Sequence, residues 1–271
     1  MKIAVSNIAW LPDQEPAAAA LLQARDVRGV EIAPTAIWRD PTAATTGERR
    51  AYRCAWARRG IAIVAFQALL YGRPDLTIFE SPSARAATVE YLSRLIRLAD
   101  DLDARVLVFG APSQRRIAGL APNEVEDVAA SFFGAIGRAA IEHGVRVCIE
   151  PIPVAWGGEF VTTIREAIDL VRRVNSEGFG VHVDAAAATA EPDPVAAIHA
   201  ARGTVAHVHA SEPGLASIGT GGVDHGQIGA ALRGIGYTGW TSIEMRAGDR
   251  AGVLKRVDAA LHTVRAAYGT E

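Results

Sequence analysis

Short runs of β-branched and other apolar residues recur at fairly even intervals along the chain, and longer stretches with helical spacing separate them. The apolar runs are Lys2–Ser6, Gly29–Ala33, Ile61–Gln67, Arg105–Gly110, Val145–Glu150, Phe179–Asp184, Thr204–His209 and Thr238–Glu244. In the stretch Ala84–Asp100, apolar side chains recur every three or four residues on one face, which predicts an amphipathic helix. The pattern therefore predicts about eight β–α units in succession.

Turn and cap residues support the same division of the chain. At four places a glycine stands between a helical stretch and the next strand, where a left-handed residue commonly follows a helix. These glycines are Gly29, Gly60, Gly144 and Gly178. Asp224 is placed to cap the helix that follows it, and Pro122 suits the first turn of another helix. Such regular alternation is typical of a parallel sheet with right-handed crossovers.

Two architectures share this alternation, an open doubly wound sheet and a closed barrel. The open sheet usually has fewer strands and a glycine-rich phosphate loop after the first one. Here the segment Ser6–Trp10 contains no glycine. The 271 residues also suit the usual length of a closed barrel, and no linker rich in Pro, Gly or Ser divides them. We predict one α/β domain over residues 1–271, a single (β/α)8 TIM barrel.

Composition narrows the expected location and partners. Hydrophobic residues make up 49% and charged residues 21%, which are globular values, and a formal charge of −2 provides no basic field for a nucleic acid. Only 2 cysteines occur, too few for a disulfide framework. The chain enters a strand-like segment at Ile3 without a secretory signal, and every apolar run is too short for a membrane helix. We expect a cytoplasmic protein with a small-molecule substrate and neither nucleic acid nor membrane as partner.

Polar side chains end the last four predicted strands, at the edge of a barrel where catalytic groups gather. They are Glu150, Asp184, His209 and Glu244. One such residue alone could form an ion pair or cap a helix, but four follow runs that should be buried, where unpaired charge is unfavourable. We interpret the set as a divalent-cation site. Its oxygen and nitrogen donors suit Mn²⁺ or Mg²⁺ best, with Co²⁺ or Zn²⁺ as further options.

Seven segments spread over nearly the whole chain carry a family resemblance: Ser6–Trp10, Gly29–Thr35, Gln67–Leu76, Ile149–Pro151, His182–Asp184, His207–Pro213 and Ser242–Met245. Together they resemble the xylose-isomerase-like barrel superfamily, in particular its sugar phosphate isomerase/epimerase branch. The resemblance implies one metal ion held by Glu150, Asp184, His209 and Glu244. It also implies that Glu150 and Glu244 act as acid and base. A homodimer is common among relatives and is one option for this chain.

The implied activity agrees with the chemistry of such a site. Isomerising or epimerising a hydroxy-carbonyl compound requires removal of a proton next to a carbonyl group, and the developing enediolate must be stabilised. A divalent ion can stabilise it as a Lewis acid, while two carboxylates on opposite sides of the carbon act as base and acid. We therefore expect a metal-dependent isomerase or epimerase of a sugar, sugar phosphate or related polyol.

Three other functions belong to related sites. A dehydratase of a cyclic polyol ketone shares the first half-reaction, so the sequence does not separate it from an epimerase. Phosphodiester hydrolysis by three zinc ions, as in endonuclease IV, needs histidines from the early strands, whereas all 7 histidines lie at or after His143. A metal-binding barrel without catalytic activity is the non-enzymatic alternative.

The chain departs from the ketohexose 3-epimerases at three positions that bind the sugar in those enzymes. Ala187 replaces a histidine, Trp156 replaces a carboxylate, and Leu215 replaces an arginine. These replacements predict poor activity on free ketohexoses and a more apolar pocket.

Several other residues are candidates for substrate contact. They are Trp10, Gln67, Trp156, His182, His207 and Arg115. The alternative for His182 and His207 is a place in the barrel core, and the alternative for Arg115 is a solvated charge pair with Arg116. The segment Gly219–Gly222 fits either a phosphate cradle or a flexible connection.

Overall fold

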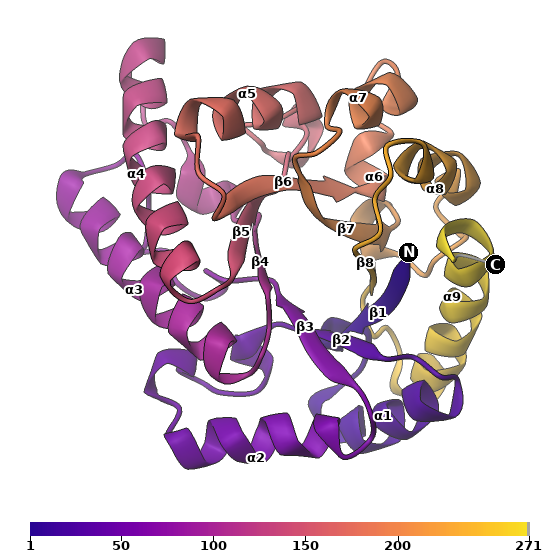
Figure 1. The fold of residues 1–271 in the computed structure, drawn as a ribbon. Helices are drawn as coiled ribbons and strands as arrows, with labels where there is room; N and C mark the ends of the chain where they lie inside the picture. The colour runs from indigo at the N-terminus through magenta and orange to yellow at the C-terminus, as the bar shows by residue number, and fades with distance from the viewer. Residues whose placement is uncertain (270–271) are drawn as a thin grey trace.

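The computed structural model describes residues 1–269, whose parallel strands form a closed barrel (Figure 1). The strands are β1 (Lys2–Ser6), β2 (Gly29–Ile32), β3 (Ala62–Phe66), β4 (Val106–Phe109), β5 (Arg146–Ile149), β6 (Phe179–Asp184), β7 (Val205–Ser211) and β8 (Trp240–Glu244). Neighbours in sequence pair in parallel, and β8 closes the barrel on β1. The predicted (β/α)8 TIM barrel is confirmed, and each observed strand differs from its predicted range by at most two residues at either end.

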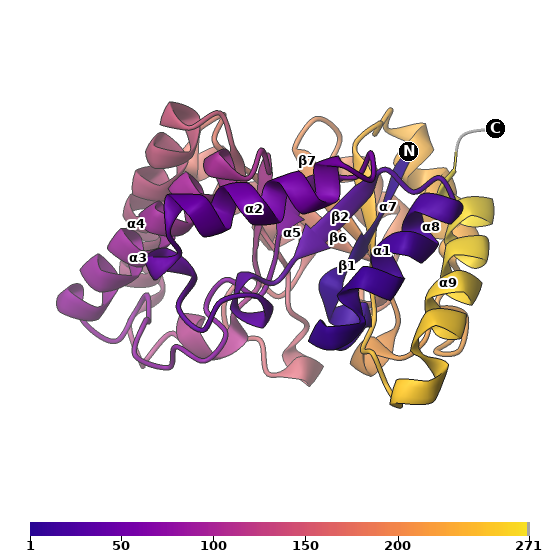
Figure 2. The same ribbon diagram turned by 90° about the horizontal axis from the view of Figure 1, so that it is seen from below.

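Helices surround the barrel, and the loops that follow the strands gather at the end opposite the N-terminus (Figure 2). The helices are α1 (Glu15–Ala24), α2 (Thr46–Ala57), α3 (Pro82–Asp101), α4 (Pro122–Glu142), α5 (Ile164–Val174), α6 (Ala185–Ala188), α7 (Pro194–Ala200), α8 (His225–Gly234) and α9 (Val253–Tyr268). Asp224 caps α8 and Pro122 opens α4, as predicted. None of the helices among residues 1–269 combines the length and apolar character that crossing a membrane requires.

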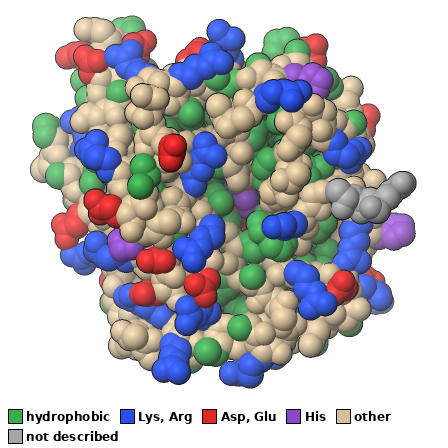
Figure 3. Space-filling model, viewed as in Figure 1, with side chains coloured by type: hydrophobic (Ala, Val, Ile, Leu, Met, Phe, Trp, Pro, Cys, Tyr) green, Lys and Arg blue, Asp and Glu red, His purple; other side chains and the backbone are tan. Residues whose placement is uncertain are grey.

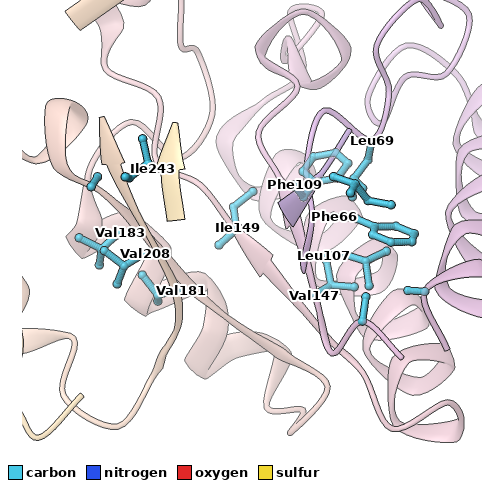
Figure 4. Close-up of a cluster of buried hydrophobic side chains, with 14 of the residues drawn as sticks. Phe66, Leu69, Leu107, Phe109, Val147, Ile149, Val181, Val183, Val208 and Ile243 are labelled. Carbon is cyan, nitrogen blue, oxygen red and sulfur yellow. The ribbon is translucent and has the colours of Figure 1, made fainter. Parts of the chain in front are cut away.

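The side chains of each strand alternate between the barrel interior and the layer of helices. The buried apolar side chains that pack in this outer layer include Phe66, Leu107, Phe109, Val147, Ile149, Val181, Val183, Val208 and Ile243 (Figure 4). On β6, Val181 and Val183 alternate with His182 and Asp184. The same alternation on β7 and β8 explains why strands made largely of apolar residues still bring polar side chains to the interior.

Of the four glycines predicted to adopt a left-handed backbone conformation, two do: Gly60 (φ 70°) and Gly144 (φ 63°). The prediction is wrong for Gly29 and Gly178. After α5, Asn175 takes the left-handed position instead, with φ 47°. Glycine is required at 29 and 178 for close approach, because an added Cβ would collide with an indole ring from β8 and with the backbone of α4, respectively.

Charged side chains of both signs are interspersed over the face of the molecule drawn in Figure 3. Figure 2 shows that this face, which carries the start of β1, lies away from the loops that follow the strands. The residues at the carboxyl ends of the strands therefore belong to the opposite face.

Candidate active site

The four predicted ligands lie together at the carboxyl ends of their strands. Asp184 and Glu244 are the last residues of β6 and β8, Glu150 directly follows β5, and His209 lies within β7. Ligand atoms of Asp184, His209 and Glu244 are all within 4.8 Å of one another, and all three residues are buried. Glu150 and His182 form a second group of the same spread with His209. This buried cluster of histidine and carboxylate side chains is consistent with a divalent metal ion.

Burial and mutual repulsion make the carboxylates of this cluster difficult to ionise. Burial raises the pKa of Glu150 to about 8, and the charges of Glu244 and Asp184 add to the rise. Burial likewise raises the pKa of Asp184 to about 6, again with a contribution from Glu244. A divalent cation would offset both effects, because it places positive charge where the carboxylates converge.

His209 provides a second reason why the donor set fits a cation. Its Nδ1 atom is buried and lies 3.1 Å from Oε2 of Glu244, yet it makes no hydrogen bond among the described residues. Burial lowers the pKa of His209, but the charges of Glu31 and Glu244 outweigh burial and raise that pKa well above its usual value. A positive species at Nδ1, a proton or a metal ion, is therefore favoured.

Glu31 is a buried carboxylate that sequence analysis overlooked as a functional residue. It is the third residue of β2, and its two carboxylate oxygens lie 3.1 and 3.0 Å from Nε2 of His209. Nε2 of His207 lies 3.3 Å from Oε1 of Glu31. Burial raises the pKa of Glu31, but the charges and hydrogen bonds of His209 and His207 outweigh burial and hold it well below its usual range. The signal in the sequence that could have identified Glu31 is its single charge in an otherwise apolar strand.

Asp184 is held in place at both carboxylate oxygens. Oδ1 accepts a hydrogen bond of 2.7 Å from the backbone N–H of Ala187, and Oδ2 accepts one from the hydroxyl of Ser211. The first bond caps α6, so the alanine-rich segment after β6 is a short helix that begins at the site. Hydrogen-bonded partners of this kind orient a metal-binding carboxylate.

A glycine and a buried arginine surround Glu150. A Cβ atom added to Gly110 would collide with Oε2 of Glu150, so the carboxylate occupies space that a larger residue would fill. Arg115 is fully buried, and its Nη2 donates a 2.7 Å hydrogen bond to the backbone carbonyl of Glu150. Burial lowers the pKa of Arg115 to about 10, although the charge of Glu150 opposes this shift. The alternative of a solvated charge pair is therefore wrong for Arg115. Of these two arginines, Arg116 is the one that is exposed.

A pocket of about 310 Å³ opens at the strand ends. Its lining residues are Glu150, Ile152, Trp156, Asp184, Ala186, Ser211, Glu212, Gly214, Leu215, Glu244 and Arg246. Trp156 and Leu215 thus form apolar walls beside the carboxylates. Arg246 is exposed and forms no ion pair among the described residues, and its backbone N–H donates a 2.9 Å hydrogen bond to the carbonyl of Leu215. A groove of about 500 Å³ between α4 and α5 is larger but contains none of the strand-end residues.

The remaining candidates for substrate contact are buried and do not line this pocket; they are Trp10, Gln67, His182 and His207. Trp10 packs against Trp56 with ring centroids 6.4 Å apart. His182 lies within the barrel with its ring centroid 4.2 Å from that of His209, and neither of its ring nitrogens has a hydrogen-bond partner among the described residues. A role of these four residues in substrate binding stays a prediction.

Glu212 organises the loop that contains the segment Gly219–Gly222. Its carboxylate accepts hydrogen bonds from the backbone N–H groups of Gly219, at 2.7 Å, and Val223, at 3.2 Å. Nε2 of His225 lies 3.3 Å from the same carboxylate. The buried carboxylate of Glu212 therefore already accepts the hydrogen bond from the N–H group of Gly219 that a phosphate cradle would use.

The sequence matches the model of the xylose isomerase-like TIM barrel family over residues 19–266. The chain belongs to that family, as its resemblance indicated. No curated protein matches the sequence at a significant level.

Several solved structures share the fold at low sequence identity. D-psicose 3-epimerase from Clostridium cellulolyticum H10, solved with D-tagatose, is 16% identical over the full length of both chains, with a TM-score of 0.86. L-ribulose 3-epimerase is 22% identical and has a TM-score of 0.78, with 98% of this chain and 96% of that chain covered. The IOLI protein, solved with a zinc atom, is 15% identical over the full length of both chains, with a TM-score of 0.78. Identities this low show a common fold alone.

Proposed function

We propose that this protein is a divalent-metal-dependent isomerase or epimerase of a sugar, sugar phosphate or related polyol. The observation that carries the proposal is the buried group of Asp184, His209 and Glu244, with Glu150 beside it, at the carboxyl ends of consecutive strands. A fold shared with sugar epimerases supports it. A set of three carboxylates and one imidazole suits Mn²⁺ or Mg²⁺ better than it suits zinc in a structural site.

The bound ion would act as a Lewis acid on the carbonyl and hydroxyl oxygens of the substrate. The chain supplies the proton transfer. Glu150 and Glu244 come from strands separated by β6 and β7 around the rim, and both line the pocket. One carboxylate oxygen takes the proton from the carbon next to the carbonyl group, and the other glutamate returns a proton from the opposite side. Ile152, Trp156 and Leu215 line the same pocket with apolar surface.

We expect the protein, as purified or after incubation with Mn²⁺, to bind about one divalent ion per chain, because the strand ends supply one set of four ligands. Elemental analysis and titration calorimetry measure the stoichiometry. Binding should weaken on acidification, because protons compete for the carboxylates and the imidazole.

Variants of two proposed ligands, with a control variant outside the pocket, test whether the ion binds at this site. Asp184→Ala and His209→Ala should each remove most of the binding, whereas Arg116→Gln, an exposed change outside the pocket, should leave it intact. Absence of binding to the folded wild-type chain would show that the site assignment is wrong.

The pocket favours a substrate that carries a phosphate or carboxylate group. A divalent ion would offset two of the three negative charges of the strand-end carboxylates, and Arg246, which forms no ion pair among the described residues, adds a positive charge at the pocket wall. A guanidinium group binds phosphate and carboxylate through paired hydrogen bonds. Leu215 offers no hydrogen bond to the hydroxyl groups of a neutral sugar, and Trp156 offers only its indole N–H.

We expect D-fructose, D-tagatose and D-psicose to be epimerised feebly. Each sugar hydroxyl left without a partner in a closed site costs about 1–3 kcal/mol, and Ala187, Trp156 and Leu215 cannot make the polar contacts of the histidine, carboxylate and arginine that they replace. Assays of the neutral sugars beside their phosphates and the related sugar acids measure the preference.

Arg246→Gln should raise KM for the anionic compounds and leave KM for neutral ones little changed, whereas Arg116→Gln should affect neither. Rapid epimerisation of a neutral ketohexose by the wild-type protein would contradict the expectation.

A further inference from the structure

Glu31 contacts the candidate metal cluster from a strand that contributes none of the four ligands. Its side chain is fully buried, and both of its carboxylate oxygens face Nε2 of His209, at 3.0 and 3.1 Å. The two residues are 178 positions apart in sequence. A carboxylate at the centre of a barrel is unfavourable unless it is paired, and the proposed proton transfer does not use it.

We propose that Glu31 is a positioning residue that fixes His209 as a metal ligand through Nδ1. This inference rests on the proposed function, because it assigns a role to Glu31 in the metal site of that function. Glu31 does not touch the substrate or the ion in this role, and acts only through the imidazole ring of His209.

Elementary hydrogen-bond chemistry gives the direction of the effect. An ionised carboxylate can only accept hydrogen bonds, so the Nε2 atom that faces Glu31 must carry the hydrogen. A neutral imidazole has a single N–H group, and its other nitrogen then presents a lone pair. That other nitrogen is Nδ1, which lies 3.1 Å from Oε2 of Glu244 and has no hydrogen-bond partner among the described residues. A lone pair and a carboxylate oxygen at this separation could both bind one ion.

The opposite tautomer would engage both ligand atoms, Nδ1 of His209 and Oε2 of Glu244, in a hydrogen bond with each other. With hydrogen on Nδ1, His209 would donate to Glu244, and a proton would stand where the ion should bind. His207 reinforces the tautomer with hydrogen on Nε2 of His209, because its own Nε2 lies 3.3 Å from Oε1 of Glu31 and so helps to hold the carboxylate in the barrel. Glu31 therefore selects the tautomer and also fixes the plane of the ring.

Metal affinity tests the proposal without relying on activity. Glu31→Gln keeps the size of the side chain but removes its charge, and its amide can either accept from or donate to Nε2. We expect the Kd for Mn²⁺, measured by titration calorimetry, to rise by about 10- to 100-fold, the usual effect of losing a partner behind a metal ligand. Glu31→Asp keeps the charge and should recover part of the affinity.

Glu212→Gln is the matched control. Glu212 is also buried at the strand ends and also faces a histidine, His225, at 3.3 Å, but among the described residues it forms no hydrogen bond or ion pair with any of the four ligands. We expect this variant to lose stability and to keep a Kd for Mn²⁺ within about threefold of the wild type, because a structural loss alone leaves the ligands in place. Equal weakening by both variants would mean that Glu31 has only a structural role.

A spectroscopic measurement on the wild-type chain covers the case in which Glu31→Gln fails to fold. Nitrogen NMR of ¹⁵N-histidine-labelled protein loaded with Zn²⁺ should show hydrogen on Nε2 of His209 and none on Nδ1. Hydrogen on Nδ1 in the loaded protein, or an unchanged Kd in folded Glu31→Gln, would overturn the proposal. Tight metal binding that depends on Glu31, without turnover of any hydroxy-carbonyl compound, would instead contradict the proposed function and leave the role of Glu31 supported.

Discussion

Glu150→Gln and Glu244→Gln are each expected to lower turnover by at least about a hundredfold, the usual scale for losing a positioned acid or base. Glutamine keeps the size of the side chain and one oxygen donor, but it cannot take a proton from carbon. Metal binding should weaken only partly, since one oxygen ligand remains. Steady-state assays, with metal content measured on the same samples, separate the loss of chemistry from the loss of the ion.

Solvent exchange can assign the two glutamates to opposite faces of the substrate. If they act on opposite faces, one variant will still exchange the carbon-bound proton of the substrate with deuterated solvent while failing to form product. The glutamate that remains in that variant is then the base for that face. Wild-type turnover in both variants, with metal bound, would refute the acid and base roles.

We also expect the metal-free protein to lose stability as the pH rises from 5 to 8.5. The pKa of Glu150 is raised from 4.5 to about 8 and that of Asp184 from 3.8 to about 6. A carboxyl group with a raised pKa binds its proton more tightly in the folded state, so its stabilising contribution is complete below the unfolded pKa and is lost as the pH rises through the folded pKa. The raised pKa of His209 acts in the same direction, whereas the lowered pKa values of His182 and His225 act in the opposite direction below about pH 7.

Thermal unfolding in the presence of a chelator measures this effect. Between pH 5 and 8.5 the unfolding midpoint should fall, and saturating Mn²⁺ should remove or reverse the trend, because the ion binds the deprotonated ligands. Glu150→Gln, which lacks one of the titrating groups, should show a shallower fall. A midpoint that is constant or rises with pH in the chelated wild-type protein would show that the carboxylates are not mutually destabilising.

The order of the strands could be predicted from the chain alone because each unit is encoded locally. A run such as Phe179–Asp184 has an apolar face every second residue, and the stretch Ala84–Asp100 has one every three or four, so the period of the pattern separates strand from helix. The cap at Asp224 and the first-turn residue Pro122 depend on residues only a few positions apart. The glycines were less predictable. Gly178 is required by contact with α4 rather than by its own backbone angles, and such a contact leaves no trace in local sequence.

The candidate site likewise has one part that the sequence predicts and another that only the tertiary structure shows. The sequence by itself placed Glu150, Asp184, His209 and Glu244 at the ends of successive strands, because a parallel barrel brings all strand ends to one rim. Only the tertiary structure showed that Glu31 meets His209 and that Arg115 is buried under Glu150. Both contacts join segments far apart in the chain, and their partners are set by closure of the barrel and by the path of a loop. Local periodicity determines which side of a strand a residue faces, whereas the residue that it meets there is decided by packing across the whole fold.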